Sequence, residues 1–152
     1  MIVFLVSLFI SYLVMSIAEY VIHRYMMHRR FFKSKALSWI FENHHISHHK
    51  HEDYTHNIDL PLYYHLLIGF PVFLILALYS WPAFLAFLIV CVYHSLSWTH
   101  CHRAIHGLEH NWLEKTHYYQ RRKIHHELHH QNPSKNFAVI FLGTDRIFGT
   151  KI

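Results

Sequence analysis

The sequence contains few of the residues on which several large classes of protein depend. It has two cysteines and four glycines in 152 residues, and only 15% of its residues are charged. Cys91 and Cys101 lie within and just beyond one apolar stretch, so they are expected to be packing thiols and not partners in a secreted disulfide framework. The few glycines form no GxGxxG fingerprint, which excludes the usual nucleotide-binding and flavin-binding loops.

Targeting, repeat and nucleic-acid-binding signals are missing as well. The segment that begins Met1-Ile-Val-Phe has no positively charged start and no AxA-like cleavage site, so a retained helix is expected instead of a secretory signal peptide. The sequence has no long internal repeat, no low-complexity linker and no legible nucleic-acid recognition module. At 152 residues, the chain is predicted to be a single domain over residues 1–152.

Apolar residues make up 53% of the chain, and most of them fall in three long stretches. These are Ile2–Ile22, Leu60–Ser80 and Pro82–Thr99, each close to the roughly 20 residues that an α-helix needs to cross a bilayer. Pro82, in the segment YSWP, suits a tight break followed by a new helix. The sequence therefore predicts three spans, of which the second and third form a hairpin.

The basic residues predict the orientation of these spans. All 14 lysines and arginines lie between Arg24 and Lys151, in segments that three spans place on one side of the membrane. The positive-inside rule makes that side the cytosol. Topology thus accounts for the net charge of +5, and no nucleic-acid partner is expected.

Histidine is abundant, with 19 residues, and most of them form four groups near the predicted cytosolic ends of the spans. In HRYMMH they are five apart, in HISHH and HELHH they follow an HxxHH spacing, and in HRAIH they are four apart. The members are His23 and His28, then His45, His48 and His49, then His102 and His106, and finally His126, His129 and His130.

This spacing is suited to metal binding. Residues i, i+3 and i+4 share a face of a helix, so each HxxHH group can point to one locus. His23 and His28 are about 140° apart on an ideal helix, and therefore either reach different metals or require a distorted helix end. A surface histidine run can be an adventitious metal trap, but four groups on one side of the membrane favour a built site.

The number of candidate ligands favours two ions. Ten imidazoles exceed what one ion takes, and imidazole alone suits zinc, copper, iron or nickel. A structural zinc site closes at four ligands, often with cysteine, and no cysteine cluster exists here. A catalytic dinuclear centre is the better interpretation.

These motifs resemble the fatty acid hydroxylase/sterol desaturase superfamily, the membrane di-iron oxygenases that include β-carotene hydroxylase-like proteins. HRYMMH resembles the HX4H box, HISHH the first HxxHH box, HRAIH the HX3H box and HELHH the last HxxHH box. The tail NFAVIFLGTDRIFGT, residues 136–150, resembles the Asn, Asp and Phe-Gly-Thr signature of sterol-desaturase-like members. The match runs from about residue 19 to residue 150. In contrast to the tail, the segment NID after the second box is closer to the carotene hydroxylases.

The resemblance implies an all-α integral membrane protein whose cytosolic helical cap holds two irons. It implies a membrane enzyme that hydroxylates or desaturates a lipid, such as a fatty acyl chain, sterol or carotenoid, with O2. The electrons would come from a separate cytochrome b5-like or ferredoxin-like donor. The implied metal ligands are His23, His28, His45, His48, His49, His102, His106, His126, His129 and His130.

Other histidines compete with these ligands, and other residues are candidates for supporting roles. The rivals within or beside the boxes are His44, His51, His100, His110 and His125. The candidates to fix the tautomers of the ligand rings are Glu42, Glu127 and Asp145, and Glu19 either supports His23, four residues on, or snorkels.

Two further sets of residues have open alternatives. The segment Arg121–Lys123 either docks an acidic electron donor or is an interfacial basic cluster, and the second interpretation is favoured. Four aromatic residues of the second span line a lipid tunnel or are packing and belt aromatics, the commoner case. They are Tyr63, Tyr64, Phe70 and Phe73.

Two other functions are considered. His65 and His94 lie at similar depths on the predicted hairpin and could bind a haem in an electron-transfer protein, although the four boxes would then be unexplained. A metal transporter usually places its ligands near the bilayer midplane, whereas these histidines lie at the cytosolic edge.

Overall fold

All the regular secondary structure of the described residues is helical. The computed structural model describes residues 1–30, 33–34, 38, 41–52, 54 and 59–152, and of these the side chain of His44 is not described. His56 and most of the NID segment fall outside the described residues. The elements are α1 (Ile2–Ile22), the π-helical η1 (His23–Met27) and η2 (Glu42–Lys50), α3 (Leu62–Tyr79), α4 (Trp81–Ile105), the 3-10 segment η3 (Trp112–Lys115), α5 (His117–Gln131) and α6 (Gly143–Ile147).

Three helices are long and apolar enough to cross a membrane, which confirms the predicted multi-pass architecture. They are α1 with its continuation to Met27, α3 and α4. The predicted break at Pro82 is confirmed, since Ser80 caps α4 and the proline lies in its first turn. Gly69 of α3 permits a close approach within the hairpin, because a Cβ atom there would lie 3.2 Å from the ring of Phe87.

Helix α4 is longer than its predicted span and ends at a glycine cap. The N–H of Gly107 donates to the carbonyl of Ala104, and that of Leu108 donates to the carbonyl of Arg103. Gly107 has φ +70°, so these bonds form the αL cap that terminates many helices. The extension carries His102 and His106 past the apolar part of α4 and into the histidine-rich end of the molecule.

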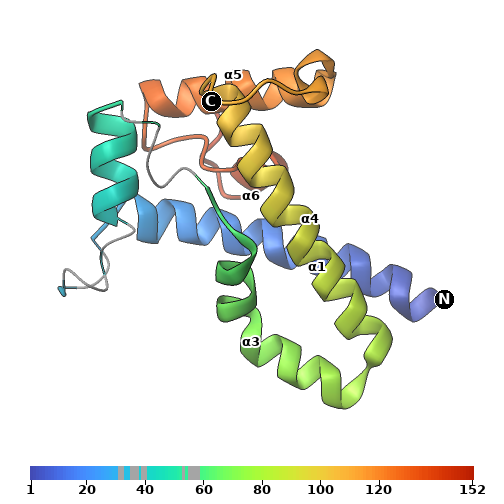
Figure 1. The fold of residues 1–152 in the computed structure, drawn as a ribbon. Helices are drawn as coiled ribbons and strands as arrows, with labels where there is room; N and C mark the ends of the chain where they lie inside the picture. Colours follow the sequence, from blue (N-terminus) through green and yellow to red (C-terminus); the bar gives the residue numbers. More distant parts are fainter. Residues whose placement is uncertain (31–32, 35–37, 39–40, 53, 55–58) are drawn as a thin grey trace.

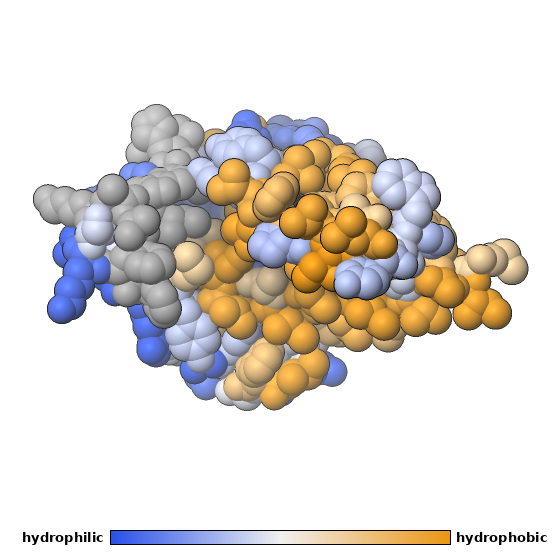
Figure 2. Space-filling view, turned by 90° about the horizontal axis from the view of Figure 1, so that it is seen from below, coloured by the Kyte–Doolittle hydropathy of each residue, from blue (hydrophilic) through white to orange (hydrophobic). Residues whose placement is uncertain are grey.

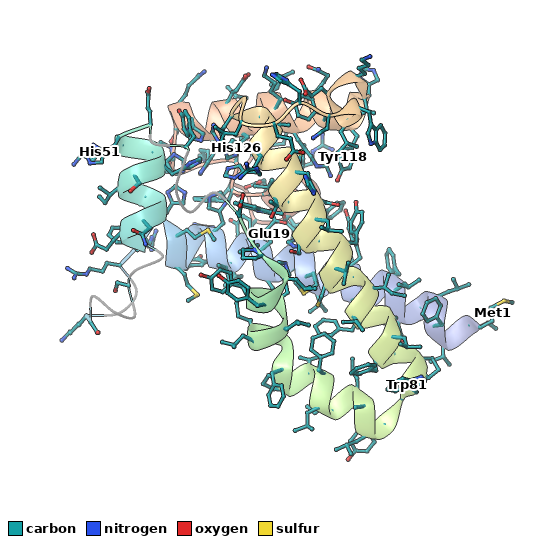
Figure 3. All side chains as sticks on the ribbon, viewed as in Figure 1. Met1, Glu19, His51, Trp81, Tyr118 and His126 are labelled. Atoms are coloured by element: carbon teal, nitrogen blue, oxygen red, sulfur yellow. The ribbon has the colours of Figure 1, made fainter. Side chains whose placement is uncertain are left out.

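The histidine-bearing segments lie at the opposite end of the molecule from Met1 and from the turn between α3 and α4. In Figure 1, η1, η2 and α5 gather around the C-terminal end of α4, and α6 lies between α5 and α1. In Figure 3, His51 and His126 lie at this end, while Met1 and Trp81 lie at the other. The topology predicted from the three spans is thus realised.

Much of the helical surface is apolar. Leu5 and Phe9 of α1, Leu67 and Phe70 of α3 and Ile89 of α4 are exposed. Figure 2 shows apolar residues over most of the described surface in that view, with hydrophilic residues toward one end. Exposed apolar surface of this extent indicates contact with lipid, and both cysteines are buried and free as predicted.

Candidate metal centre

Eight histidines form two adjacent groups whose nitrogens could each hold one ion. Within each group the potential ligand atoms lie within 4.8 Å of one another. Cluster I combines η1 and its end with η2 and α5, and cluster II combines η2, the end of α4 and α5. Cluster I consists of His23, His28, His49 and His129, and cluster II of His48, His106, His126 and His130.

The ring nitrogens of two members of cluster II and of the adjacent His102 converge on His126. The Nε2 atom of His126 lies 3.0 Å from the Nε2 atoms of His102, His106 and His130. A single ring nitrogen has one proton or one lone pair, so it cannot satisfy three such neighbours. Two nitrogens at 90° on a metal, each about 2.1 Å from it, are also about 3.0 Å apart. The convergence therefore fits a cation.

Each HxxHH box is divided between the two clusters, whereas the sequence suggested one locus for each box. His48 belongs to cluster II and its neighbour His49 to cluster I, while His129 belongs to cluster I and its neighbour His130 to cluster II. Consecutive residues on a helix point about 100° apart, so adjacent histidines reach toward different ions. The two boxes thus join the clusters into one centre.

A π-helical segment explains how both histidines of the first box, five residues apart, reach the same cluster. The N–H of His28 donates to the carbonyl of His23 at 3.2 Å, a bond between residues five apart. This wider turn brings the two rings to 4.9 Å between centroids, and both belong to cluster I. Of the two alternatives raised by the spacing, distortion of the helix end is the one observed, and such π segments occur frequently at functional sites.

Two of the predicted ligands lie at the edges of the clusters. His102 is fully buried and contacts His126 through Nε2, as described above. His45 approaches His28 instead, with 3.4 Å between their Nδ1 atoms. Since Nε2 of His28 lies 3.1 Å from Nε2 of His129 in cluster I, His45 contacts the outer nitrogen of that ring.

Backbone carbonyls of the C-terminal tail accept from the outer nitrogens of cluster I. The Nδ1 atom of His129 donates to the carbonyl of Lys135 at 2.6 Å, and that of His23 donates to the carbonyl of Phe137. These bonds direct Nε2 of both rings inward. Between the two carbonyls, Asn136 is fully buried and has φ +54°, a left-handed conformation that asparagine tolerates better than most residues.

Asp145 fixes this tail segment. Its buried carboxylate accepts from the N–H groups of Phe137 and Ala138, from Thr150 Oγ1 and from His125 Nε2. Burial alone would raise the pKa of Asp145, but these hydrogen bonds outweigh it and hold the pKa below its usual value. The Asn136, Asp145 and Thr150 positions of the tail signature therefore have a structural explanation.

Glu19 holds the same segment from the membrane side. Its carboxylate accepts from the N–H groups of Val139 and Ile140 and lies 2.8 Å from His94 Nε2. His94 Nδ1 in turn lies 3.0 Å from His65 Nε2. A haem would need these two rings on opposite faces of its macrocycle, so their direct contact contradicts the haem interpretation.

The clustered histidines are held in the neutral form that binds metal. Burial, followed by the neighbouring imidazoles, lowers the pKa of His48 to about 2 and that of His106 to about 3. Burial also lowers the pKa of His130 to about 4 and those of His126 and His129 well below the usual value. Neutral imidazole offers a lone pair, so these rings can coordinate an ion without first losing a proton.

The rival histidines whose side chains are described lie outside the two clusters. His110 and His51 are exposed, and His110 lies 3.3 Å from Glu114. His100 contacts Glu109, and the buried His125 contacts Asp145.

The two other acidic residues that were candidates to fix the tautomers of the ligand rings form exposed ion pairs. Glu42 pairs with Arg30, and Glu127 with Lys123, both with exposed side chains. Phe73 packs against Phe84 and Phe87 within the hairpin. The remaining aromatics of α3 include Tyr63 and Phe70, which are exposed on its outer surface, and Tyr64, whose ring packs against Tyr63.

Sequence reasoning did not identify the carbonyls of Lys135 and Phe137 as ring acceptors. Every residue has a carbonyl, so the only available signal was the tail signature at residues 136–150.

Comparison with known proteins identifies one family. The family model described as fatty acid hydroxylase matches residues 8–150 of the chain. No curated protein and no solved structure matches it. The matched segment includes all four histidine boxes and the C-terminal tail.

Proposed function

This chain belongs to the fatty acid hydroxylase family, whose enzymes are membrane di-iron oxidoreductases, and from that premise we propose that it hydroxylates or desaturates a lipid. The substrate class comprises fatty acyl chains, sterols and carotenoids. Hydroxylation would insert one oxygen atom of O2 into a C–H bond, and two electrons and two protons would reduce the other atom to water. A separate cytochrome b5-like or ferredoxin-like protein would supply the electrons.

The proposed cofactor is a pair of iron ions, one at each cluster. Cluster I would hold one ion, and cluster II with His102 would hold the other, while His45 would contact the outer nitrogen of His28. Bound iron would supply the oxidising power needed to attack an unactivated C–H bond, chemistry that no side chain of the chain can perform. The observation that carries the proposal is the convergence of His102, His106 and His130 on Nε2 of His126 at 3.0 Å.

The chain itself would orient and shield this centre. The carbonyls of Lys135 and Phe137 keep protons on Nδ1 of His129 and His23, so Nε2 of each ring is available to an ion. His102, His126 and His129 are at most 1% exposed, which excludes water from the inner faces of the clusters. Water exclusion strengthens the electrostatic interactions of a bound ion and limits side reactions.

The histidine end of the molecule is proposed to face the cytosol. All 14 lysines and arginines lie between Arg24 and Lys151, in segments beyond the apolar parts of the three spans. The positive-inside rule then orients the chain, and a cytosolic electron donor would have direct access to the clusters.

The function can be tested by expressing the chain in a host that is supplied with candidate lipids. Mass spectrometry should reveal a product heavier by one oxygen atom, or lighter by two hydrogen atoms, that requires O2. His48→Ala and His129→Ala should abolish the product, and His110→Ala is the matched control because its side chain is 86% exposed and lies outside both clusters. Product formation by His48→Ala at the wild-type level would contradict the proposal, as would purified protein that contains zinc and no iron.

A further inference from the structure

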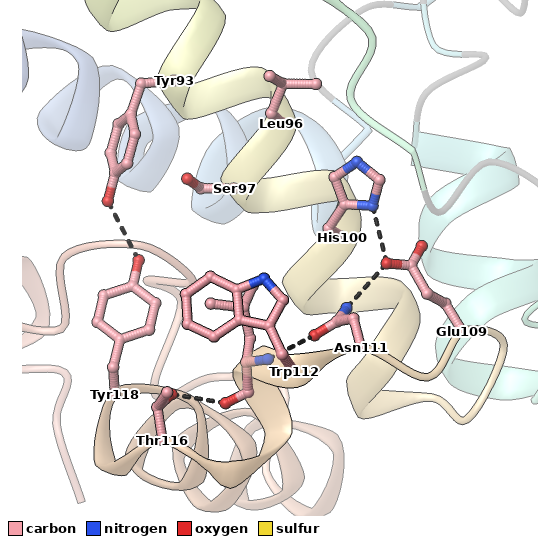
Figure 4. A pocket seen from close by; sticks show the side chains of 10 residues that line it. Tyr93, Leu96, Ser97, His100, Glu109, Asn111, Trp112, Thr116 and Tyr118 are labelled. Carbon is pink, nitrogen blue, oxygen red and sulfur yellow. Dashed lines mark hydrogen bonds and ion pairs between the residues drawn. The ribbon is translucent and has the colours of Figure 1, made fainter.

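The polar groups of two cavities among the described residues outside the metal clusters differ. The first, of about 670 Å³, lies between α4 and the segment from Glu109 to Tyr118. Figure 4 shows that its polar side chains pair with one another: His100 contacts Glu109, Asn111 donates to Glu109, and the hydroxyls of Tyr93 and Tyr118 meet. This cavity offers no unmatched charge to a ligand.

The second cavity, which we term the basic cleft, is strongly cationic. It has a volume of about 1040 Å³ and lies between α5 and the tail from Ile140 to Ile152. Arg121, Arg122, Arg146 and Lys151 line it, and none of its described lining residues has a carboxylate side chain. Arg103 and Lys123 have acidic partners within 4 Å, whereas no ion pair among the described residues involves any of the four cleft cations.

Arg122 is the most deeply buried of these cations. It is only 7% exposed, and its terminal nitrogens donate to the carbonyls of Tyr118 and Ile140. Its Nε atom is buried without a hydrogen-bond partner. The guanidinium also lies over the ring of Tyr118, 3.1 Å from its centroid, which offsets part of the cost of burying a cation without an anion. The planar fork of donors of an arginine matches a phosphate group.

The basic cleft lies against a membrane helix. Phe141, in its wall, contacts Tyr12 of α1 with 5.8 Å between ring centroids, and Phe148 stacks on Tyr20 of α1 at 4.5 Å. Ile124 at the cleft and Ile147 beside it are 58% and 70% exposed. Tyr12 lies midway along α1 and Tyr20 lies near its C-terminal end. Cations next to exposed apolar side chains beside that end are typical of a lipid headgroup site.

We propose that the basic cleft binds the phosphate of an anionic phospholipid from the surrounding bilayer. The phosphate lies between Arg121, Arg122 and Arg146, and the acyl chains follow the apolar side chains toward α1. A phospholipid is favoured over an acidic protein because Arg122 lines the cavity but is only 7% exposed, so a small headgroup can reach it more readily than a convex protein surface can. This site is separate from the metal clusters and is independent of the oxidation chemistry.

The proposal can be tested on the full-length chain, delipidated in a neutral detergent. Native mass spectrometry would measure the binding of phosphatidylglycerol, of diacylglycerol with the same acyl chains, and of inorganic phosphate. The test variant is Arg121→Gln with Arg146→Gln, and the matched control is Lys33→Gln with Lys115→Gln, which also removes two exposed cations but leaves the cleft intact. Lys151→Gln is a milder second variant.

Wild type and control should bind phosphatidylglycerol saturably and should bind neither diacylglycerol nor inorganic phosphate at the same concentration. Loss of two cations near the headgroup should weaken binding about 30-fold, and Lys151→Gln about fivefold. Equal binding of phosphatidylglycerol by wild type and the double variant would overturn the proposal. So would inorganic phosphate that binds as tightly as the lipid, or an acidic electron-donor protein whose binding the double variant loses while lipid binding is unchanged.

Discussion

Cluster I and cluster II differ in how the protein holds their rings. In cluster I, carbonyls of the tail accept from the outer nitrogens of His23 and His129. In cluster II, the rings of His106 and His130, together with the adjacent His102, converge on Nε2 of His126. The outer nitrogen of His126 is buried without a hydrogen-bond partner. The comparison indicates that the backbone sets the ring orientation of cluster I before a metal binds, whereas cluster II depends more on the metal to organise its central ring.

The largest effect is expected from removal of one ligand from each cluster. His126→Ala and His129→Ala should both abolish lipid oxidation, because each removes a ring from the interior of a cluster. Metal analysis should show a lower iron content in both variants, and His126→Ala should also leave His102, His106 and His130 without their common contact. Wild-type product formation by either variant, measured beside His110→Ala, would contradict the assignment of these residues.

Glu19→Ala would release the tail from the membrane side of cluster I. The N–H groups of Val139 and Ile140 and the ring of His94 would lose a buried acceptor, and the loss of one partner of such a network costs about 3–5 kcal/mol. Thermal unfolding in detergent should report this loss. Glu19→Gln is the control, since its amide oxygen can still accept from the two N–H groups, and an equal loss in both variants would show that the negative charge is what matters.

Asn136→Val would disturb cluster I without removing a ligand. A β-branched residue is strongly disfavoured at φ +54°, so the carbonyls of Lys135 and Phe137 should rotate away from their rings. Iron affinity should fall about 10-fold to 100-fold, the usual range for loss of a partner that orients a ligand. Asn136→Gly tolerates the same backbone conformation and should retain most of the affinity, which iron titration of the two variants would establish.

Acidification should destabilise the metal-free protein through the buried histidines of both clusters, because burial lowers the pKa of His28, His49 and His129 as well. The pKa of His130 is lowered to about 4 and that of His106 to about 3 from a usual value of 6.5. Between pH 6.5 and about 4, the unfolded chain binds protons at these residues and the folded chain does not, so the free energy of unfolding falls as the pH falls. Melting temperatures at pH 7, 5.5 and 4 would test this, and His106→Gln should reduce the dependence on pH.

The smallest effect is expected at the pair of Lys123 and Glu127, on the exposed face of α5. Their charged atoms are 3.9 Å apart, and both side chains are more than 40% exposed. An exposed pair of this kind contributes little, so Lys123→Ala and Glu127→Ala should each change the free energy of unfolding by no more than about 0.5 kcal/mol. A larger change, or a loss of iron, would mean that Glu127 supports the centre after all.

Much of the architecture could be predicted from the sequence, because the patterns that indicate it lie within short segments. Apolar length predicted the three spans, and Pro82 predicted the turn of the hairpin. The four boxes identified every histidine that the two clusters contain, because the motifs lie within six residues or fewer along the chain. The end of α4 was less accurately predicted, since the helix continues beyond its apolar part until Gly107 terminates it.

The sequence by itself determined the helical fold class, the membrane helices and the histidines that the two clusters contain. Each of these follows from composition or spacing over a short segment. Only the tertiary structure decided that each HxxHH box is divided between two clusters, that tail carbonyls orient the rings of cluster I, and that Glu19 ties this tail to α1. Those arrangements depend on the directions of side chains from segments about 100 residues apart, such as His28 and His129. Packing sets those directions, and a backbone carbonyl has no signature in the sequence.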